Sequence, residues 1–137
     1  MVPFSLESLL SALDSVDGLA LQVHQDFKPI YCTRDYARIF GFESPDDFLK
    51  LKSILDIVPT EHHTEAKKRY KLALEQGFSE PLQIKSQKPN GDVIWIRVQD
   101  QLMHHGSEIY MLTFIEDISN EVSRQEQLAE AHLQQKK

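Results

Sequence analysis

The chain has 137 residues, of which 41% are hydrophobic and 26% charged, so it can bury the core of one ordinary domain. Its formal net charge of −6 has the wrong sign for a surface that attracts the phosphates of nucleic acids. The single cysteine, Cys32, cannot form a disulfide within the chain, which predicts a reducing, cytoplasmic location. The first 21 residues resemble neither a signal peptide nor a membrane span, so we expect no direct membrane contact by this domain.

A short amphipathic helix is predicted over residues 5–16. Leucines recur there at the i, i+3, i+4 and i+7 spacing of one helix face, Ser5 is a suitable N-cap, and Gly18 lies beyond the end. Alternating apolar residues over 19–23, a turn-like segment and a second short run over 30–32 then predict a β-hairpin.

Broken helical structure is predicted between residues 33 and 58, where Thr33 and Ser44 are suitable caps. Thr60 is expected to cap a longer helix that closes at Gly77. The inward side of this helix is predicted to consist of Ala66, Tyr70, Ala73 and Leu74.

Three further strands are predicted over residues 82–85, 94–98 and 109–115, with a hairpin turn at 89–92. The last strand is apolar on both faces, which indicates a central strand. We expect the helical middle to cover one face, and the N-terminal helix or a second subunit to cover the other. From Ser119 the composition becomes polar with a partial apolar stripe, which predicts an exposed helix that leads to another domain.

The sequence signatures of common enzymes are absent. The chain has no G-x-S-x-G, Walker A, G-x-G-x-x-G or H-E-x-x-H motif, and its five glycines are dispersed. The adjacent histidine pairs 62–63 and 104–105 direct their side chains differently, so no metal site and no catalytic residue is predicted. One enzyme alternative stays open, a small cone-shaped α+β enzyme with an interior acid/base pair. Its candidate groups are His24, Asp26, Glu61 and Glu65.

Several stretches, in this order and spacing, resemble the motifs of PAS sensor domains. They are Lys28-Pro-Ile-Tyr-Cys-Thr, the run 37–48 with Gly-Phe before an acidic helix start, Ile57-Val-Pro, Lys88-Pro-Asn-Gly-Asp-Val-Ile-Trp-Ile-Arg and Asp117-Ile-Ser. The resemblance implies an α+β fold with a PAS-like five-stranded antiparallel sheet and helices on one face. It also implies a cap helix over residues 1–17, a PAS domain over 18–118 and a C-terminal signalling helix over 119–137.

A PAS resemblance implies a sensory signal-transduction module and no enzyme. Such a module binds a small ligand or dimerises, and it signals through its C-terminal helix to a histidine kinase, a diguanylate cyclase or a transcription regulator. The Asn-Cys-Arg-Phe-Leu motif of the flavin-binding branch is absent, and the haem-binding branch places its histidine deeper in the long helix than His62 and His63. No cofactor is therefore predicted, with a haem-based redox or gas sensor as an alternative. Thr33 stands where the family commonly has Asn.

The expected pocket is lined by inward side chains of the strands and helices. Its candidates are Leu21, Val23, Ile39, Phe40, Phe48, Ile54, Tyr70, Leu74, Ile96, Val98, Met111 and Thr113. The alternative is a closed core in a dimerising adaptor. We expect the strand-to-helix junction to relay a signal through Asp117 and Ser119. A homodimer is expected because the apolar surface is large for a monomer. The residues for the dimer or cap are Leu6, Leu9, Leu10, Leu13, Trp95, Leu112 and Phe114.

Overall fold

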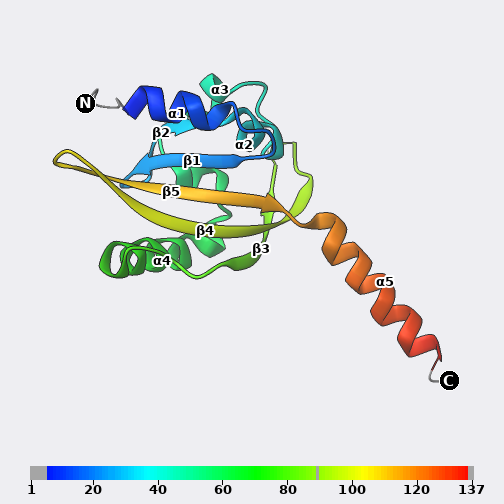
Figure 1. Cartoon of the computed structure of the whole chain (residues 1–137). Helices are drawn as coiled ribbons and strands as arrows, with labels where there is room; N and C mark the ends of the chain where they lie inside the picture. The colour runs from blue at the N-terminus through cyan, green and yellow to red at the C-terminus, as the bar shows by residue number, and fades with distance from the viewer. Residues whose placement is uncertain (1–5, 89, 136–137) are drawn as a thin grey trace.

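The computed structural model describes residues 6–88 and 90–135, and its centre is one five-stranded antiparallel sheet in the order β2-β1-β5-β4-β3 (Figure 1). The strands are β1 (Ala20–Gln25), β2 (Lys28–Cys32), β3 (Leu82–Gln87), β4 (Val93–His105) and β5 (Glu108–Asp117). The helices are α1 (Leu6–Asp14), α2 (Arg34–Ile39), α3 (Pro45–Leu49), α4 (His63–Gln76) and α5 (Ser119–Gln135), with 3-10 turns at Ile54–Ile57 and Thr60–His62. The predicted α+β fold with a five-stranded antiparallel sheet is confirmed. Pro89 of the predicted β3–β4 turn lies outside the described residues.

The two faces of the sheet bury two separate apolar clusters. On the face beside α1, Leu10 packs with Leu21, Val23 and Leu112. On the opposite face, the larger cluster joins side chains of α2, α3 and the strands. These core residues include Tyr36, Phe40, Phe48, Ile94 and Ile96. The strand β5 lies in the middle of the sheet, which confirms the central position predicted from its two apolar faces.

A strained two-residue turn joins β1 to β2. Its residues, Asp26 and Phe27, have φ angles of 49° and 69°, in the left-handed region that non-glycine residues rarely adopt. Three contacts hold the turn: Tyr70 Oη accepts from the Asp26 N–H at 3.1 Å, His24 Nδ1 accepts from the Phe27 N–H at 3.1 Å, and the Ile54 N–H donates to the Phe27 carbonyl at 2.7 Å. The turn is thereby fixed against helical segments that surround the same side of the sheet.

Thr33 ties the hairpin to α2. Its hydroxyl donates to the Leu19 carbonyl at 2.8 Å and accepts from the N–H groups of Leu21 at 3.1 Å and Tyr36 at 3.3 Å. The last of these bonds caps α2, as predicted from the sequence. The side chain is buried, and all of its hydrogen-bonding capacity is used within the scaffold.

The inward side of α4 differs from the predicted one at two positions. Ala73 is fully buried, and Ala66 and Tyr70 are partly buried, but Leu74 is 40% exposed, so its assignment to the inward side was wrong. Arg69 is turned inward instead, with its side chain 22% exposed. A charged residue occupies this position because a carboxylate on the sheet lies opposite it, which a hydrophobic pattern does not reveal.

The final helix, α5, projects away from the sheet (Figure 1). Its leucines Leu128 and Leu133 are 64% and 66% exposed. In the part of the chain that the structure describes, no helix combines the length and the apolarity needed to cross a membrane.

Candidate functional site

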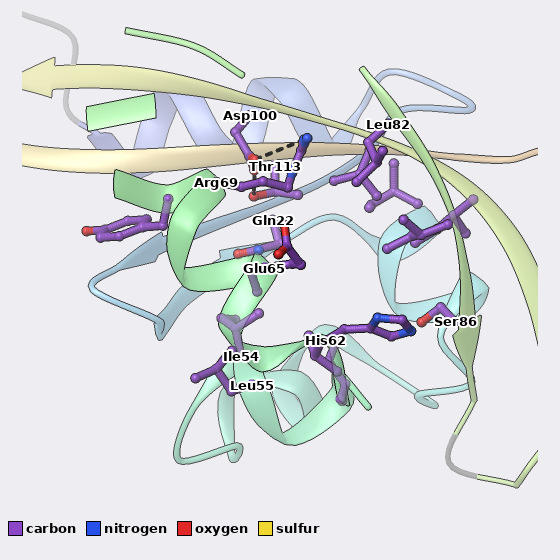
Figure 2. A pocket seen from close by; sticks show the side chains of 18 of the residues that line it. Gln22, Ile54, Leu55, His62, Glu65, Arg69, Leu82, Ser86, Asp100 and Thr113 are labelled. Atoms are coloured by element: carbon purple, nitrogen blue, oxygen red, sulfur yellow. Dashed lines mark hydrogen bonds and ion pairs between the residues drawn. The ribbon is translucent and has the colours of Figure 1, made fainter. Parts of the chain in front are cut away.

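A cavity of about 370 Å³ lies between the sheet and the helical middle, on the face opposite α1. Four strands line it, together with α4, the two 3-10 turns that precede α4 and Tyr36 of α2 (Figure 2). The exposed lining residues lie at the start of α4 and on β3, so the cavity opens between these two elements. These residues are His62, Glu65, Leu82 and Lys85.

The cavity brings together part of the predicted pocket. The predicted residues that line it are Phe40, Ile54, Tyr70, Ile96, Val98 and Thr113. Phe48, Ile39 and Met111 are buried or partly buried but do not line it, and Leu74 is exposed.

The placement of Leu21 and Val23 corrects the predicted pocket. Both are fully buried in the cluster beside α1, and the polar residues that alternate with them, Gln22 and His24, face the cavity instead. Successive side chains of a strand point to opposite faces of the sheet. Once one residue of β1 is assigned to the wrong face, the assignments of all four residues from 21 to 24 are reversed. The apolar residues of β1 occupy the closed face because α1 seals that face from water.

A polar row crosses three adjacent strands at the cavity wall. Gln22 on β1 is paired with Thr113 on β5, and Thr113 is paired with Asp100 on β4. The Asp100 carboxylate accepts from Thr113 Oγ1 at 2.7 Å and from Ser79 Oγ at 3.0 Å, and Arg69 Nη2 lies 3.6 Å from it (Figure 2). Arg69 Nη2 also donates to Ser79 Oγ at 2.9 Å. The charge of the buried carboxylate is thus balanced within the protein.

The row ends in an acceptor without a donor. Gln22 is 2% exposed, and its Oε1 is the one buried side-chain oxygen or nitrogen of the described residues that has no hydrogen-bond partner. Its neighbour Thr113 has a single hydroxyl proton, which it donates to Asp100. An orphaned buried acceptor is costly, typically about 1–3 kcal/mol.

His24 lies beside Gln22 on the same face of β1. Burial lowers the pKa of His24 to about 4, and the nearby carboxylates of Asp100 and Asp26 oppose that shift only in part. The ring is therefore neutral at pH 7. Because Nδ1 accepts the Phe27 N–H, the proton resides on Nε2, which makes no hydrogen bond to the described residues. His24 thus offers a donor to the cavity that it lines.

Among the other candidate acid, base and metal-binding groups, Asp26 is near His24 and opposes the lowering of its pKa, whereas the rest lie elsewhere. His63 Nε2 lies 2.9 Å and 2.8 Å from the carbonyl oxygens of Leu55 and Val58, whereas His62 and Glu65 line the exposed mouth. Among residues 6–88 and 90–135, no three His, Cys, Asp or Glu side chains are grouped so as to hold a metal ion. Glu61 is near His62, at 3.7 Å, and does not line the cavity.

The residues do not fit the thiol chemistry of a photosensitive flavin. Cys32, the single cysteine of the sequence, is buried in the core and does not line the cavity. Burial also raises the pKa of the Cys32 thiol to about 12, so the reactive thiolate is scarce at neutral pH.

The junction between β5 and α5 is bonded to β4. Ser119 Oγ accepts from the Trp95 N–H at 3.0 Å, the Ser119 N–H donates to Asp117 Oδ1 at 2.9 Å, and the Ile118 N–H donates to the Trp95 carbonyl at 2.9 Å. Ile118 is 1% exposed and anchors the start of α5. The two predicted relay residues, Asp117 and Ser119, therefore lie where the sheet meets the helix.

The predicted dimer or cap residues separate into two places. Leu10, Leu13, Leu112 and Phe114 belong to the cluster between α1 and the sheet, so the chain's own helix covers much of that face. Trp95 lies apart from this cluster, partly buried, with Lys85 Nζ 5.5 Å from its ring centre. The side chains of Leu6 and Leu9 lie outside the described residues.

Comparison with solved structures identifies the class of fold. A PAS domain from Colwellia psychrerythraea is 15% identical with a TM-score of 0.69, over 84% of this chain and 98% of that chain. A PAS domain of a LuxR-family transcriptional regulator from Burkholderia thailandensis, solved with ethanol, is 17% identical with a TM-score of 0.63, over 85% and 99%. An RNA-binding light-oxygen-voltage receptor is 15% identical with a TM-score of 0.69, over 96% and 40%. The chain therefore has the fold of PAS domains.

No family model and no curated protein matches the chain. The similar structures include a PAS domain of a two-component sensor histidine kinase, the PAS domain of the LuxR-family regulator and a sensory box histidine kinase/response regulator. Sequence reasoning missed Gln22, Arg69 and Asp100 as cavity residues. The sequence feature that could have revealed Gln22 is the alternation in β1, where polar residues occupy the face opposite the apolar ones.

Proposed function

We propose that this chain is a sensory module that binds a small molecule in its cavity and passes a conformational signal through α5 to an effector domain of the parent chain. The observation that carries the proposal is the cavity with its orphaned acceptor, Gln22 Oε1, because a buried polar group without a partner is paired once a ligand supplies a donor. The PAS fold supports the same class of function.

The proposed signal path runs along β5. Thr113 contributes to the cavity wall, and four residues further along the same strand Asp117 bonds to the first turn of α5. On the neighbouring strand, Arg97 bonds to Glu116 at 2.7 Å and to Glu121 of α5 at 3.3 Å. A ligand that favours one packing of β5 shifts the equilibrium of the junction by its difference in affinity for the two arrangements.

Native mass spectrometry of the purified chain, before and after refolding from denaturant, tests whether it retains a compound. We expect an adduct that refolding removes. Hydrogen exchange of residues 118–122 then measures the coupling, and we expect faster exchange in the stripped protein because the junction loses one of its stabilised arrangements. An unchanged mass together with unchanged exchange contradicts the proposal.

A pair of serine variants locates the relay. Ser119→Ala removes the acceptor of the Trp95 N–H, so the difference in exchange between loaded and stripped protein should shrink. Ser123→Ala is the matched control, because Ser123 lies on the exposed part of α5. Equal effects of the two variants contradict a relay through Ser119.

The proposal includes a cytoplasmic homodimer, with no metal, haem or flavin as cofactor. The exposed leucines Leu128 and Leu133 of α5 support pairing with a second copy, because a helix of this polarity gains stability from a partner. Sedimentation at high micromolar concentration should give a dimer, and a monomer there contradicts this part of the proposal.

A further inference from the structure

The inner end of the cavity has no unbalanced charge. Arg69 Nη2 contacts Asp100, Ser79 and, at 3.2 Å, the carbonyl oxygen of Glu80. Each oxygen of Asp100 already accepts a hydroxyl proton. Because the charges of Arg69 and Asp100 balance each other, neither an anionic nor a cationic ligand meets a net opposite charge at this pair. The charged lining residues Glu65 and Lys85 lie at the exposed mouth, where water screens them.

Two neutral side chains of β1, Gln22 and His24, each have a polar atom without a hydrogen-bond partner among the described residues, and these two atoms have opposite polarity. Gln22 presents an acceptor, Oε1, and His24 presents a donor, Nε2–H. Both side chains come from the same face of β1, two positions apart, and strand geometry places their backbones roughly 6.6 Å from each other. A compact polar group of a ligand, with one donor and one acceptor, can therefore form hydrogen bonds with both side chains.

The remaining wall at this end is apolar. The rings of Phe27 and Tyr70 lie 4.8 Å apart and adjoin the His24 ring, at 5.4 Å and 5.5 Å. A flat or apolar body suits such a wall, because its burial contributes roughly 25 cal/mol per Å².

We infer that the ligand of this cavity is an uncharged, mostly apolar molecule with a carboxamide-like polar end, whose N–H or O–H donates to Gln22 Oε1 and whose carbonyl or ether oxygen accepts from His24 Nε2. Because it names the ligand class of the same cavity, this inference rests on the proposed function.

Four probes of equal size and different polarity test the ligand class. Benzamide carries both a donor and an acceptor, acetophenone lacks the donor, benzoate is an anion and benzamidinium is a cation. Titrations followed by the backbone amide signals of Gln22 and Thr113 give the dissociation constants. We expect benzamide to bind at least fivefold more tightly than acetophenone, and at least tenfold more tightly than benzoate or benzamidinium.

Gln22→Leu keeps the size of the side chain and removes the acceptor. It should reduce the preference for benzamide over acetophenone to less than twofold. The control is Ser86→Ala, which removes another buried polar side chain of the cavity wall, on β3 at the far side of the sheet, and should leave the preference intact.

The outcomes separate the ligand class from the proposed function. Equal or tighter binding of benzoate or benzamidinium, or an unchanged preference in Gln22→Leu, overturns the ligand class and leaves binding in the cavity standing. Absence of binding by all four probes also overturns the ligand class. The proposed function is tested separately, by native mass spectrometry of a retained compound and by hydrogen exchange of residues 118–122 at the start of α5.

Discussion

The two faces of the sheet are formed by the same strands, but one is closely packed and the other holds a cavity. The face beside α1 is filled: Leu21 and Val23 are fully buried, and the cluster around them consists of apolar and aromatic side chains. The opposite face keeps a cavity, and in its wall lies a row of polar groups whose bonds converge on Asp100. The packed face therefore stabilises the fold. The cavity face is less stabilising because it leaves space unfilled and a polar group without a hydrogen bond, as is common at functional sites.

The largest expected effect comes from breaking the closed face. Leu21→Ala should lower the free energy of unfolding by about 4 kcal/mol, because a fully buried leucine leaves both lost transfer energy and a cavity. Urea denaturation measures the change. Leu72→Ala on the exposed side of α4, where the leucine is 48% exposed, is the control and should change stability by less than about 0.5 kcal/mol. Similar small effects of both variants contradict a tightly packed closed face.

Acidification should weaken the cavity face through His24. The folded pKa of about 4 lies below the ordinary value of 6.5, so between these values the unfolded chain binds a proton that the folded chain does not. Stability that is present above pH 6.5 is therefore lost as the pH falls to 4, by up to about 3 kcal/mol. Denaturation at several pH values checks this slope. His24→Asn should remove most of it, and His105→Asn, at an exposed position, should not.

Removal of one donor to Asp100 should cost an intermediate amount. Thr113→Val leaves Oδ1 of the buried carboxylate without its bond of 2.7 Å, and we expect a loss of about 2 kcal/mol. Thr64→Val, at an exposed position of α4, provides the comparison and should stay within about 0.5 kcal/mol. If Thr113→Val is neutral by chemical denaturation, the row does not stabilise the cavity wall.

The smallest effect should have the opposite sign. Gln22→Leu removes the orphaned acceptor and adds apolar surface, so the ligand-free protein should gain about 1 kcal/mol of stability. Thermal unfolding of stripped protein measures the gain, with Gln83→Leu at an exposed position of β3 as the control. A loss of stability in Gln22→Leu means that the amide is satisfied in solution.

Element order was predictable because it depends on local patterns, whereas the five-stranded antiparallel sheet was expected from the resemblance to PAS domains. The alternation in β3 and β4, the hairpin before Thr33 and the two apolar faces of β5 are properties of short segments. The candidate site was predictable only in part. Phe40, Tyr70 and Thr113 were recognised from helical and strand periodicity, whereas Gln22 was missed because its polarity suggested exposure to solvent.

The sequence by itself determined the kinds of elements, their order and the central place of β5, since hydrophobic periodicity and turn residues act over a few positions. Only the tertiary structure decided which face of β1 looks into the cavity and that Arg69 turns inward. Those choices depend on what lies opposite: α1 seals the apolar half of β1 from water, and Asp100 compensates the charge of Arg69. Such pairings join residues distant in the chain, and their energies arise only once the segments have packed together.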